Sequence, residues 1–544
     1  MNKLHKLINS VLYTIIAVSF LFLTGCHSIK LPENVFTPLD YTDQDVIQNE
    51  INVIRALQEN ECTKALFRAY LLKDEQLVEE CLAIVQNKLE AAIQEKNYSL
   101  VIKYLKSIES VKSTNNELAA LYEESLKAFY NDVPGYKVEE KKLPQTIPEC
   151  IDATVTVWVD QGYKVANGAG YADIVIGSGF FIDSRGYIIT NHHVIQEVVN
   201  PKRKTTCKLY VKLPSDMEKK IPAKVIGYDS IMDLALLKVE YEPKYVFALG
   251  ASSDLGVGDK ISVIGTPLGL EGTLTGGIIS STTRSLLTMG NVFQIDAAVN
   301  SGNSGGPMID KDRKVQAIIF AGMLQFQGLS FAIPVEYLKQ ELPRLYCGDE
   351  LVHGWLGAYG HTKRQQSDNK GLEIQYVMPG GSASYSGLKI DDIIITVDGN
   401  EIKTLEEFQL LCMKYGPGTV LPCKYLRDGY EQETLIYLEK RPVAPLKEIY
   451  ASDFIDDSFI PIFGMKIIRS STTNRKLYKI DYVLEGSAAE FNGFSEDDLL
   501  ELHDVYLDEK NEALCAVIVI QRKTHGLLSI QMGLAAPYDS PNYF

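Results

Sequence analysis

A glycine-rich loop at positions 300–307 presents one serine in a setting that suits nucleophilic chemistry. The loop reads Asn-Ser-Gly-Asn-Ser-Gly-Gly-Pro, and its central serine is Ser304. Because glycine adopts backbone conformations that other residues resist, the loop can expose the Ser304 hydroxyl and neighbouring N–H groups on one tight turn. Such donors stabilise the oxyanion of a tetrahedral intermediate, and losing one typically costs about 2.7–4 kcal/mol of barrier. The loop predicts acyl transfer at Ser304, with an oxyanion hole drawn from Gly302, Asn303 and Ser304.

A serine hydroxyl is a poor nucleophile at neutral pH and requires a base. Two adjacent histidines, His192 and His193, lie in the segment Thr-Asn-His-His-Val at 190–194. We expect this segment at the end of a strand, where neighbouring side chains point in different directions, so only one imidazole can face Ser304. Position alone leaves both candidates open.

The base in turn needs a buried carboxylate, which orients the imidazole and stabilises its protonated form. Asp233 directly precedes the apolar run Leu-Ala-Leu-Leu-Lys-Val at 234–239, and an acid in that position can reach inward. Asp229 lies shortly before it and is the alternative. The chain order histidine, aspartate, serine is that of chymotrypsin and differs from the orders in subtilisin and the α/β-hydrolases.

Together these segments resemble the HtrA (DegP/DegQ) branch of the chymotrypsin-fold serine proteases. The family pattern T-N-x-H-V implies His193 as the base, with His192 in the variable position. The family segment D-[IL]-A-[VL]-[IL]-[KR]-[VI] implies Asp233 as the orienting acid. The resemblance implies a serine endopeptidase that needs no metal or cofactor. Further matches occur in the family's order at 263–270, 276–280, 296–300 and 328–334.

One position bears on substrate preference. In trypsin the aspartate that selects charged side chains lies six residues before the nucleophile, and this sequence has Ala298 there. With Val299 beside it, and no carboxylate to meet Lys or Arg, we expect a preference for small or medium aliphatic side chains, which unfolded proteins expose. The predicted pocket consists of Ala298, Val299, Leu329 and Ser330.

The elements that must position these residues are predicted from the surrounding pattern. The helical signal ends near Pro134-Gly135, and short β-rich runs separated by glycine turns follow. Short strands at this spacing predict an all-β barrel or sandwich. The resemblance implies a chymotrypsin-like double β-barrel, and we assign this trypsin-like serine protease domain to 146–347.

Two modules of a second kind follow the protease. Residues 351–442 resemble a PDZ domain, in which Leu356, Gly357 and Ala358 would bind a peptide carboxylate and the adjoining strand would take the peptide as an additional strand. Residues 443–544 repeat the pattern but depart from the family at the peptide-binding turn. We expect a degenerate PDZ-like domain there, with peptide binding and a packing or assembly role both open.

The N-terminal residues are predicted to be a targeting signal. A positively charged start and a short apolar stretch end in Leu-Thr-Gly-Cys at 23–26, which resembles a bacterial lipobox. We expect a lipoprotein signal peptide at 1–25 and lipidation of Cys26, which would hold the protein on a membrane. An uncleaved anchor or an ordinary secretory signal is the alternative. Apolar residues three and four apart then predict a helical spacer region within 26–145, acting as a stalk or a docking element.

Composition sets the remaining limits. A chain of 544 residues is too long for one core, and its formal charge of -16 would repel phosphate backbones, so nucleic acid is not expected as a partner. Apart from Cys26, the cysteines are scattered without the spacing of a zinc site. We expect buried free thiols, with a Cys412–Cys423 disulfide as the alternative.

The sequence therefore predicts a multidomain protein with an N-terminal α-helical region, an all-β double barrel and two C-terminal PDZ-like α+β domains. The expected function is quality control in the bacterial envelope, by cleavage of unfolded or C-terminally exposed polypeptides. The protein would be lipid-anchored and face the periplasm, on either the inner or the outer membrane. The resemblance implies a homotrimer or a higher oligomer. A non-catalytic chaperone or PDZ adaptor on the same fold is the alternative.

Overall fold

The computed structural model describes residues 44–544, with short gaps. The predicted signal peptide and Cys26 lie outside the described residues. Ala83–His353 and Gln409–Gly416 form one compact unit, and the remaining described residues form the other. Among the described residues, no helix combines the length and apolarity needed to cross a membrane. The gaps are 113–115, 138, 167–168, 202–205, 267–271, 285, 287–288, 301, 323–328, 366–367, 472–475 and 524–526.

The N-terminal part is helical, as the apolar spacing predicts. In α2 the buried face contains Ile54 and also Glu50, whose carboxylate is paired with the Arg68 guanidinium of α3 through two hydrogen bonds. Because both charged groups are buried, this pairing is what makes their burial tolerable. The helices are α2 (Gln44–Leu57), α3 (Cys62–Leu72), α4 (Glu75–Gln94), α5 (Tyr98–Val111) and α6 (Asn116–Asp132).

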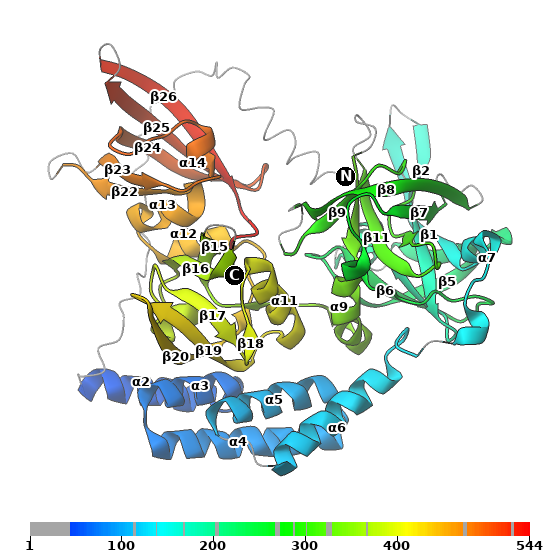
Figure 1. Cartoon of the computed structure of the whole chain (residues 1–544), viewed down its shortest axis with the longest axis horizontal. Helices are drawn as coiled ribbons and strands as arrows, with labels where there is room; N and C mark the ends of the chain where they lie inside the picture. The colour runs from blue at the N-terminus through cyan, green and yellow to red at the C-terminus, as the bar shows by residue number, and fades with distance from the viewer. Residues whose placement is uncertain are drawn as a thin grey trace. The chain divides into compact units, whose positions relative to one another are not determined.

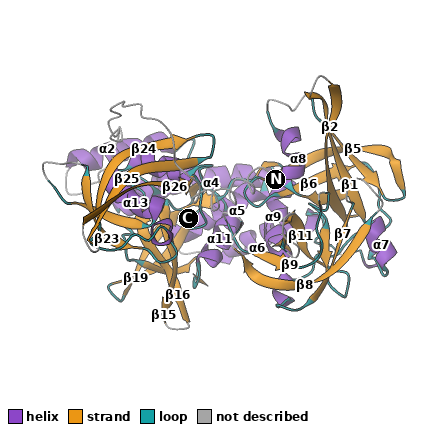
Figure 2. Cartoon of the chain, turned by 90° about the horizontal axis from the view of Figure 1, so that it is seen from above, coloured by secondary structure: helices purple, strands orange, loops and turns teal. Residues whose placement is uncertain are grey.

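Two β-barrels form the protease part, which confirms the predicted chymotrypsin-like fold. Figure 2, with strands in orange, shows that strands build most of this part, and that α7 (Ile147–Asp152), α8 (His192–Val199) and α9 (Val335–Cys347) are its helices. In β1, the alternate residues Val155, Val157 and Val159 are fully buried in the first core. This alternation is the period of a half-buried strand.

The first barrel has the strand order β13-β5-β4-β1-β2-β3-β6, and it closes because β5 also pairs with β6. Its strands are β1 (Thr154–Ala166), β2 (Ala169–Asp183), β3 (Tyr187–Thr190), β4 (Lys208–Leu213), β5 (Asp216–Asp229), β6 (Leu234–Val239) and the short β13 (Asp349–Glu350). The second is a closed barrel in the order β10-β11-β12-β9-β8-β7. Its strands are β7 (Lys260–Gly265), β8 (Thr273–Arg284), β9 (Val292–Ile295), β10 (Pro307–Ile309), β11 (Val315–Gly322) and β12 (Ser330–Pro334).

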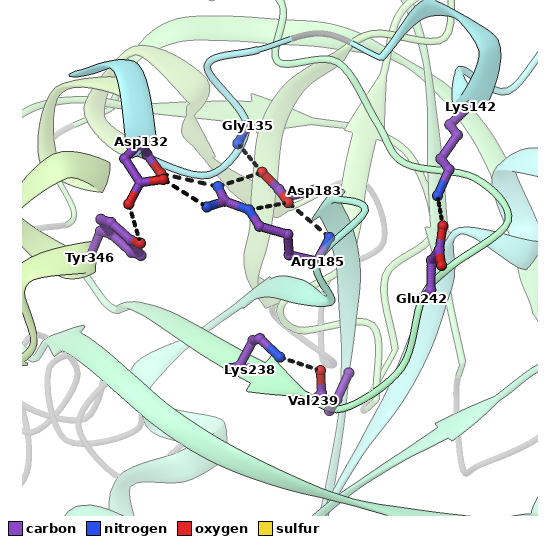
Figure 3. Close-up of polar contacts among 9 residues, drawn as sticks. All are labelled: Asp132, Gly135, Lys142, Asp183, Arg185, Lys238, Val239, Glu242 and Tyr346. Carbon is purple, nitrogen blue, oxygen red and sulfur yellow. Dashed lines mark hydrogen bonds and ion pairs between the residues drawn. The ribbon is translucent and has the colours of Figure 1, made fainter. Parts of the chain in front are cut away.

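The end of α6 is tied to the protease by a group of ionic contacts (Figure 3). Arg185, in the turn between β2 and β3, donates to the Asp183 carboxylate at 2.8 and 2.9 Å, and to the side chain and carbonyl of Asp132 at 3.1 and 3.0 Å. The Tyr346 hydroxyl of α9 donates to the other Asp132 oxygen at 2.9 Å. The last helix of the N-terminal region is therefore packed on the protease.

The first PDZ-like module is a six-stranded sheet, in which β15-β16-β17-β19-β20 are neighbours in that order and β18 pairs with β17. The helix α11 (Leu405–Tyr415) is inserted between β18 and β19. Its other elements are β14 (Gly354–Trp355), β15 (Ala358–Gln365), β16 (Asp368–Val377), α10 (Ser382–Tyr385), β17 (Ile393–Val397), β18 (Asn400–Glu401), β19 (Val420–Arg427), β20 (Tyr430–Tyr437) and β21 (Glu439–Lys440). The strand β15 and α11 are the elements between which a PDZ domain takes its peptide.

The second module has the same order of strands but lacks a counterpart of α11. After the helices α12 (Pro445–Ser452) and α13 (Ile455–Phe463), its sheet runs β22-β23-β24-β25-β26. Residues 509–512, all of which the structure describes, form a turn that joins β24 directly to β25. Without the helix that would form one wall of a peptide groove, this module favours the packing role over peptide binding. The elements are β22 (Met465–Arg469), β23 (Leu477–Val483), α14 (Ala488–Phe491), β24 (Leu499–Asp508), β25 (Ala513–Lys523) and β26 (Leu527–Pro537), the last two drawn in red in Figure 1.

The cysteines of the described region are free thiols, including Cys412 and Cys423, so the alternative disulfide does not form. Six of the eight are buried, as expected, whereas Cys347 is exposed and Cys515 partly exposed. Burial raises the pKa of Cys423 to about 12, so this thiol remains protonated and unreactive at neutral pH.

Candidate active site

His193 and Asp233 form a tight pair in the first barrel. His193 lies in the first turn of α8, and Asp233 directly precedes β6. The His193 Nδ1 atom is 2.7 Å from Asp233 Oδ2, and the His193 backbone N–H donates to Asp233 Oδ1 at 2.7 Å. Because both carboxylate oxygens hold the same residue, the ring is oriented with Nε2 as its free nitrogen. This is the arrangement that a serine protease base requires.

The two histidines begin a helix, which corrects the expectation that they lie at a strand end. The strand β3 stops at Thr190, and Asn191 is the N-cap of α8. The His192 ring does not face Asp233 but stacks on Tyr228, with ring centroids 5.1 Å apart and planes 13° apart. Burial lowers the pKa of His192 below its usual value, so this imidazole is held neutral against the barrel wall.

The Ser304 loop precedes β10 of the second barrel and is hydrogen-bonded to the first barrel. The Ser304 carbonyl accepts the Ser178 N–H at 2.7 Å, and the Ser178 hydroxyl donates to the Gly302 carbonyl at 2.6 Å. Gly305 has a φ of 86°, and a Cβ there would lie 2.2 Å from the Ser178 carbonyl oxygen and 3.1 Å from the Asn191 nitrogen. Only glycine therefore allows the loop to sit this close to Asn191, at the start of the helix that carries His193.

The Ser304 hydroxyl makes no hydrogen bond to the described residues, His193 included. The structure thus brings the loop to the His193 helix but does not close the bond between Ser304 Oγ and His193 Nε2. In free enzymes this contact is often long and tightens only when substrate binds. The predicted triad consequently consists of one formed pair and a neighbouring, half-buried serine.

One of the three predicted oxyanion-hole donors is already hydrogen-bonded within the loop. The Asn303 N–H donates to the Asn300 carbonyl at 3.0 Å, so it is already engaged in the turn and does not point at substrate. Within the described region, the N–H groups of Gly302 and Ser304 have no internal acceptor. Gly302 has a φ of 102°, which favours glycine at this position. These two groups remain the predicted donors.

The four predicted pocket residues flank the ends of β9 and β12. Ala298 is exposed and Val299 is half-buried against the second barrel's core. Ser330 is buried, and its hydroxyl donates to the Ala297 carbonyl at 3.0 Å. This hydroxyl proton is therefore already used in a bond within the barrel. Leu329 is half-buried next to it. Because the adjacent segment 323–328 lies outside the described residues, the role of these four residues stays a prediction.

Behind Asp233 lies a cluster that sequence patterns did not reveal. Asp229, the alternative acid, is fully buried, and its carboxylate bonds to residues other than His193. Its Oδ1 accepts the N–H groups of Ile231 at 2.8 Å and Met232 at 3.0 Å, and its Oδ2 is 2.8 Å from His353 Nε2. Asp229 therefore stabilises the short turn that leads to Asp233. Asp233 itself has a left-handed backbone conformation, with a φ of 56°.

Glu341 completes this cluster from α9. Its Oε1 is 3.6 Å from His353 Nδ1, and all three side chains have no exposed surface. Burial, and then the neighbouring Asp229 carboxylate, raises the pKa of Glu341 well above its usual value. Burial also opposes ionisation of Asp229, but the adjacent His353 and the hydrogen bonds outweigh it and lower the pKa of Asp229. We therefore describe Asp229 as ionised and Glu341 as protonated.

The same cluster is the group of described side chains that comes closest to a metal site. Asp229, Glu341 and His353 each offer one ligand atom, and these atoms lie within 4.8 Å of one another. Asp229 already has three hydrogen-bond partners, whereas both Glu341 carboxylate oxygens and His353 Nδ1 have no hydrogen-bond partner among the described residues. Asp229 is separated from Glu341 and His353 by more than a hundred positions, and isolated acids and histidines at such separations carry no sequence signal.

The predicted peptide-binding turn lies between β14 and β15. Leu356 and Ala358 are buried, and Gly357 has a φ of 80°. The Leu356 carbonyl accepts the Ala383 N–H at 2.9 Å, and the Gly357 carbonyl accepts the Met378 N–H at 2.9 Å. The turn is thus held by α10 and the end of β16, and the Ala358 N–H begins the open edge of β15.

Family profiles match successive segments of the chain, in the same order as the protease part and the two PDZ-like modules. Residues 177–318 match a trypsin-like peptidase domain, 349–422 a PDZ domain, and 446–538 a TP0546 family PDZ domain. The helical residues 45–130 match a domain of unknown function (DUF8517).

Curated relatives of this chain are described as serine endoproteases. A probable periplasmic serine endoprotease DegP-like from Hahella chejuensis is 35% identical over 278 residues, which are 49% of this chain and 57% of the relative. A protein of the same description from Marinomonas sp. is 32% identical over 345 residues, 60% of this chain and 70% of the relative. Among solved structures, the HtrA-type protease AlgW with decapeptide shares 25% identity over 54% of this chain and 96% of its own, with a TM-score of 0.44.

Proposed function

This chain belongs to the family of DegP-like serine endoproteases, and on that premise we propose that it cleaves unfolded or damaged polypeptides, with Ser304 as the nucleophile. The observation that most directly supports this is the His193–Asp233 pair at 2.7 Å, beside a glycine loop that carries Ser304. A trypsin-like fold alone would not separate an enzyme from an inactive relative. An oriented base beside a serine hydroxyl that bonds to none of the described residues does favour the enzyme.

Each residue has a defined part in the proposed reaction. His193 Nε2 takes the proton of Ser304 as Oγ attacks the substrate carbonyl, and returns it to the leaving amine. Asp233 Oδ2 accepts the hydrogen bond from His193 Nδ1 and stabilises the imidazolium. The N–H groups of Gly302 and Ser304 stabilise the oxyanion. Water then hydrolyses the acyl-enzyme with His193 again as base.

The substrates are polypeptides that expose small or medium aliphatic side chains. Ala298 and Val299 supply an apolar wall and no charge, which supports this preference. The relatives are named periplasmic, and we place this protein in the bacterial envelope, held there by a lipid on Cys26. We further propose that it assembles as a homotrimer or a higher oligomer.

Covalent labelling tests the proposed activity. The protein should react with a fluorophosphonate probe and degrade reduced casein, since both processes need an activated Ser304. A folded protein that binds casein but takes up no label would instead support the non-catalytic chaperone or PDZ adaptor.

Acidification should slow cleavage, because a protonated His193 cannot accept the Ser304 proton. We expect kcat/KM for casein to fall as the pH is lowered from about 8 to about 5, the range in which histidine protonation usually occurs. Thermal unfolding recorded at each pH controls for loss of structure. A rate that stays constant down to pH 5, with the fold intact, would contradict a histidine base.

A further inference from the structure

The last residues of the sequence run along the open edge of β15 in the first PDZ-like module. The Ala358 N–H donates to the Phe544 main-chain oxygen at 2.9 Å, and the Phe544 N–H donates to the Ala358 carbonyl at 3.0 Å. Further along, the Gly360 N–H donates to the Asn542 carbonyl at 3.1 Å. Tyr359 and Tyr543 form the antiparallel bridge between these bonds. The segment 542–544 is therefore an additional strand on β15.

The side chain of Phe544 is held between β15 and α11. Only 3% of Phe544 is exposed, and its ring meets Phe408 of α11 edge to face, with centroids 5.3 Å apart. On the strand side, a Cβ at Gly360 would lie 3.2 Å from a Phe544 ring carbon. The ring thus fills the space between strand and helix, where a PDZ domain takes the terminal side chain of a peptide.

Contacts with residues outside β15 and α11 also hold the C-terminal segment in the groove. Asp539 accepts two hydrogen bonds from Arg441, at 2.9 and 2.7 Å. Tyr543 is 2% exposed, its ring lies 5.4 Å from that of Tyr359, and its hydroxyl donates to the Pro461 carbonyl at 2.7 Å. The strand β26 ends at Pro537, so a few residues span the distance from the second module's sheet to the groove.

We propose that the groove of the first PDZ-like module is occupied by the chain's own segment 542–544, and that an external peptide binds only by displacing it. The ligand class follows from the occupant: an extended peptide with an aromatic residue at the position of Phe544. The second module, which has no α11 counterpart, thereby serves to supply the ligand. This inference goes beyond the proposed proteolysis and does not depend on it.

Tethering sets the size of the expected effect. A ligand on a short connection has an effective concentration of about 1 mM, so a segment with an intrinsic Kd of about 10–100 μM weakens the apparent affinity of a competing peptide roughly 10- to 100-fold. Weakening the tail should therefore make the groove bind an external peptide more tightly.

A peptide with the sequence of residues 538–544, Tyr-Asp-Ser-Pro-Asn-Tyr-Phe, is the probe. It is labelled at its amino end and titrated against the full chain, in a Ser304→Ala background that prevents cleavage. Fluorescence anisotropy should show a Kd at least about 10-fold lower when Phe544→Ala is added. The matched control is Phe491→Ala, since Phe491 is 85% exposed and makes no part of the groove. It should leave the Kd unchanged. Equal Kd values for the Phe544→Ala protein and its parent, or no binding to either, would overturn the proposal.

Hydrogen exchange on the chain with its tail unaltered removes any dependence on how Phe544→Ala folds. At millimolar peptide, the Phe544 amide should lose its protection, while the Ala358 and Gly360 amides stay protected because the incoming peptide takes over their bonds. If all three amides keep their protection at saturating peptide, the tail is a permanent part of the module and the proposal fails.

Discussion

Replacing Ser304 with alanine should lower kcat for casein by about 10⁶-fold and abolish fluorophosphonate labelling, while the melting temperature stays close to that of the parent. The fold should survive because the loop is held through main-chain atoms: the Ser304 carbonyl accepts the Ser178 N–H, and the Gly302 carbonyl accepts the Ser178 hydroxyl. The Ser304 hydroxyl itself bonds to none of the described residues, so its removal leaves no buried partner unsatisfied.

Ser253→Ala is the matched control for this variant. Ser253 is exposed in the short 3-10 helix at Ser252–Asp254, far in sequence from the glycine loop, and its loss should change neither labelling nor casein degradation. Residual labelling of the Ser304→Ala protein at the parent rate would place the nucleophile elsewhere and remove the basis for the triad.

The sequence was sufficient for the parts of this site that depend on local patterns. The glycines around Ser304 and the acid before the apolar run at 234–239 each constrain a few consecutive residues, and the structure brings His193 and Asp233 together as expected. The alternation of β1 likewise predicted a barrel strand whose inward side chains are fully buried. These are signals of periodicity and turn chemistry, which act over short stretches of chain.

Predictions failed where the details of a local turn, or a contact with a distant segment, decide the structure. The two histidines start a helix in a β-rich region: β3 ends at Thr190 and α8 begins at His192, and the Asn191 side chain between them makes no capping hydrogen bond. The Asn303 N–H is taken by the Asn300 carbonyl, a detail of turn geometry that glycine content does not specify. The pairing of 542–544 with β15 joins residues far apart in the chain, and a short polar segment before a terminal aromatic pair carries no sign of its partner.

The cluster behind Asp233 provides the second large effect. Asp229→Ala should lower kcat/KM by about 100-fold, since misplacing a catalytic group by about 1 Å costs that much. Without the Asp229 carboxylate, the N–H groups of Ile231 and Met232 lose their acceptor and His353 loses its partner. The turn that presents Asp233 would then relax. The loss should appear in kcat more than in KM, because the residues of the predicted substrate pocket lie in the other barrel.

A stability control separates positioning from general damage. Asp183 is also a buried carboxylate of the first barrel, and it pairs with Arg185 (Figure 3). Removing the Asp183 carboxylate takes away its hydrogen bonds from Arg185, but Arg185 is 42% exposed and keeps its bond to Asp132, so the cost should stay below the about 3–5 kcal/mol of a fully buried pair. Asp183→Ala should therefore lower the free energy of unfolding while kcat/KM stays near that of the parent. If Asp183→Ala reduces kcat as much as Asp229→Ala does, the Asp229 effect is only one of stability.

Glu341→Gln tests the protonation assigned to the same cluster. A neutral amide replaces a neutral acid of similar shape, so activity should change little, in contrast to Asp229→Ala. The groups that face Glu341 are Asp229 and His353, with Arg344 as the nearby cation that opposes the rise of its pKa. An unfolded chain releases the Glu341 proton near about pH 4.3, whereas the folded protein retains it to higher pH. Stability must therefore fall as the pH rises above that value.

The expected slope of this loss is about 1.4 kcal/mol per pH unit for one retained proton. Asp229 adds no slope in this range, because its lowered pKa gives a contribution that is complete above about pH 3.9 and is lost only on further acidification. The free energies of unfolding in urea of the parent and of Glu341→Gln should diverge between about pH 5 and pH 8. The parent should lose stability relative to the variant as the pH increases. Parallel curves would mean that Glu341 is ionised in the folded protein and would contradict the assigned protonation.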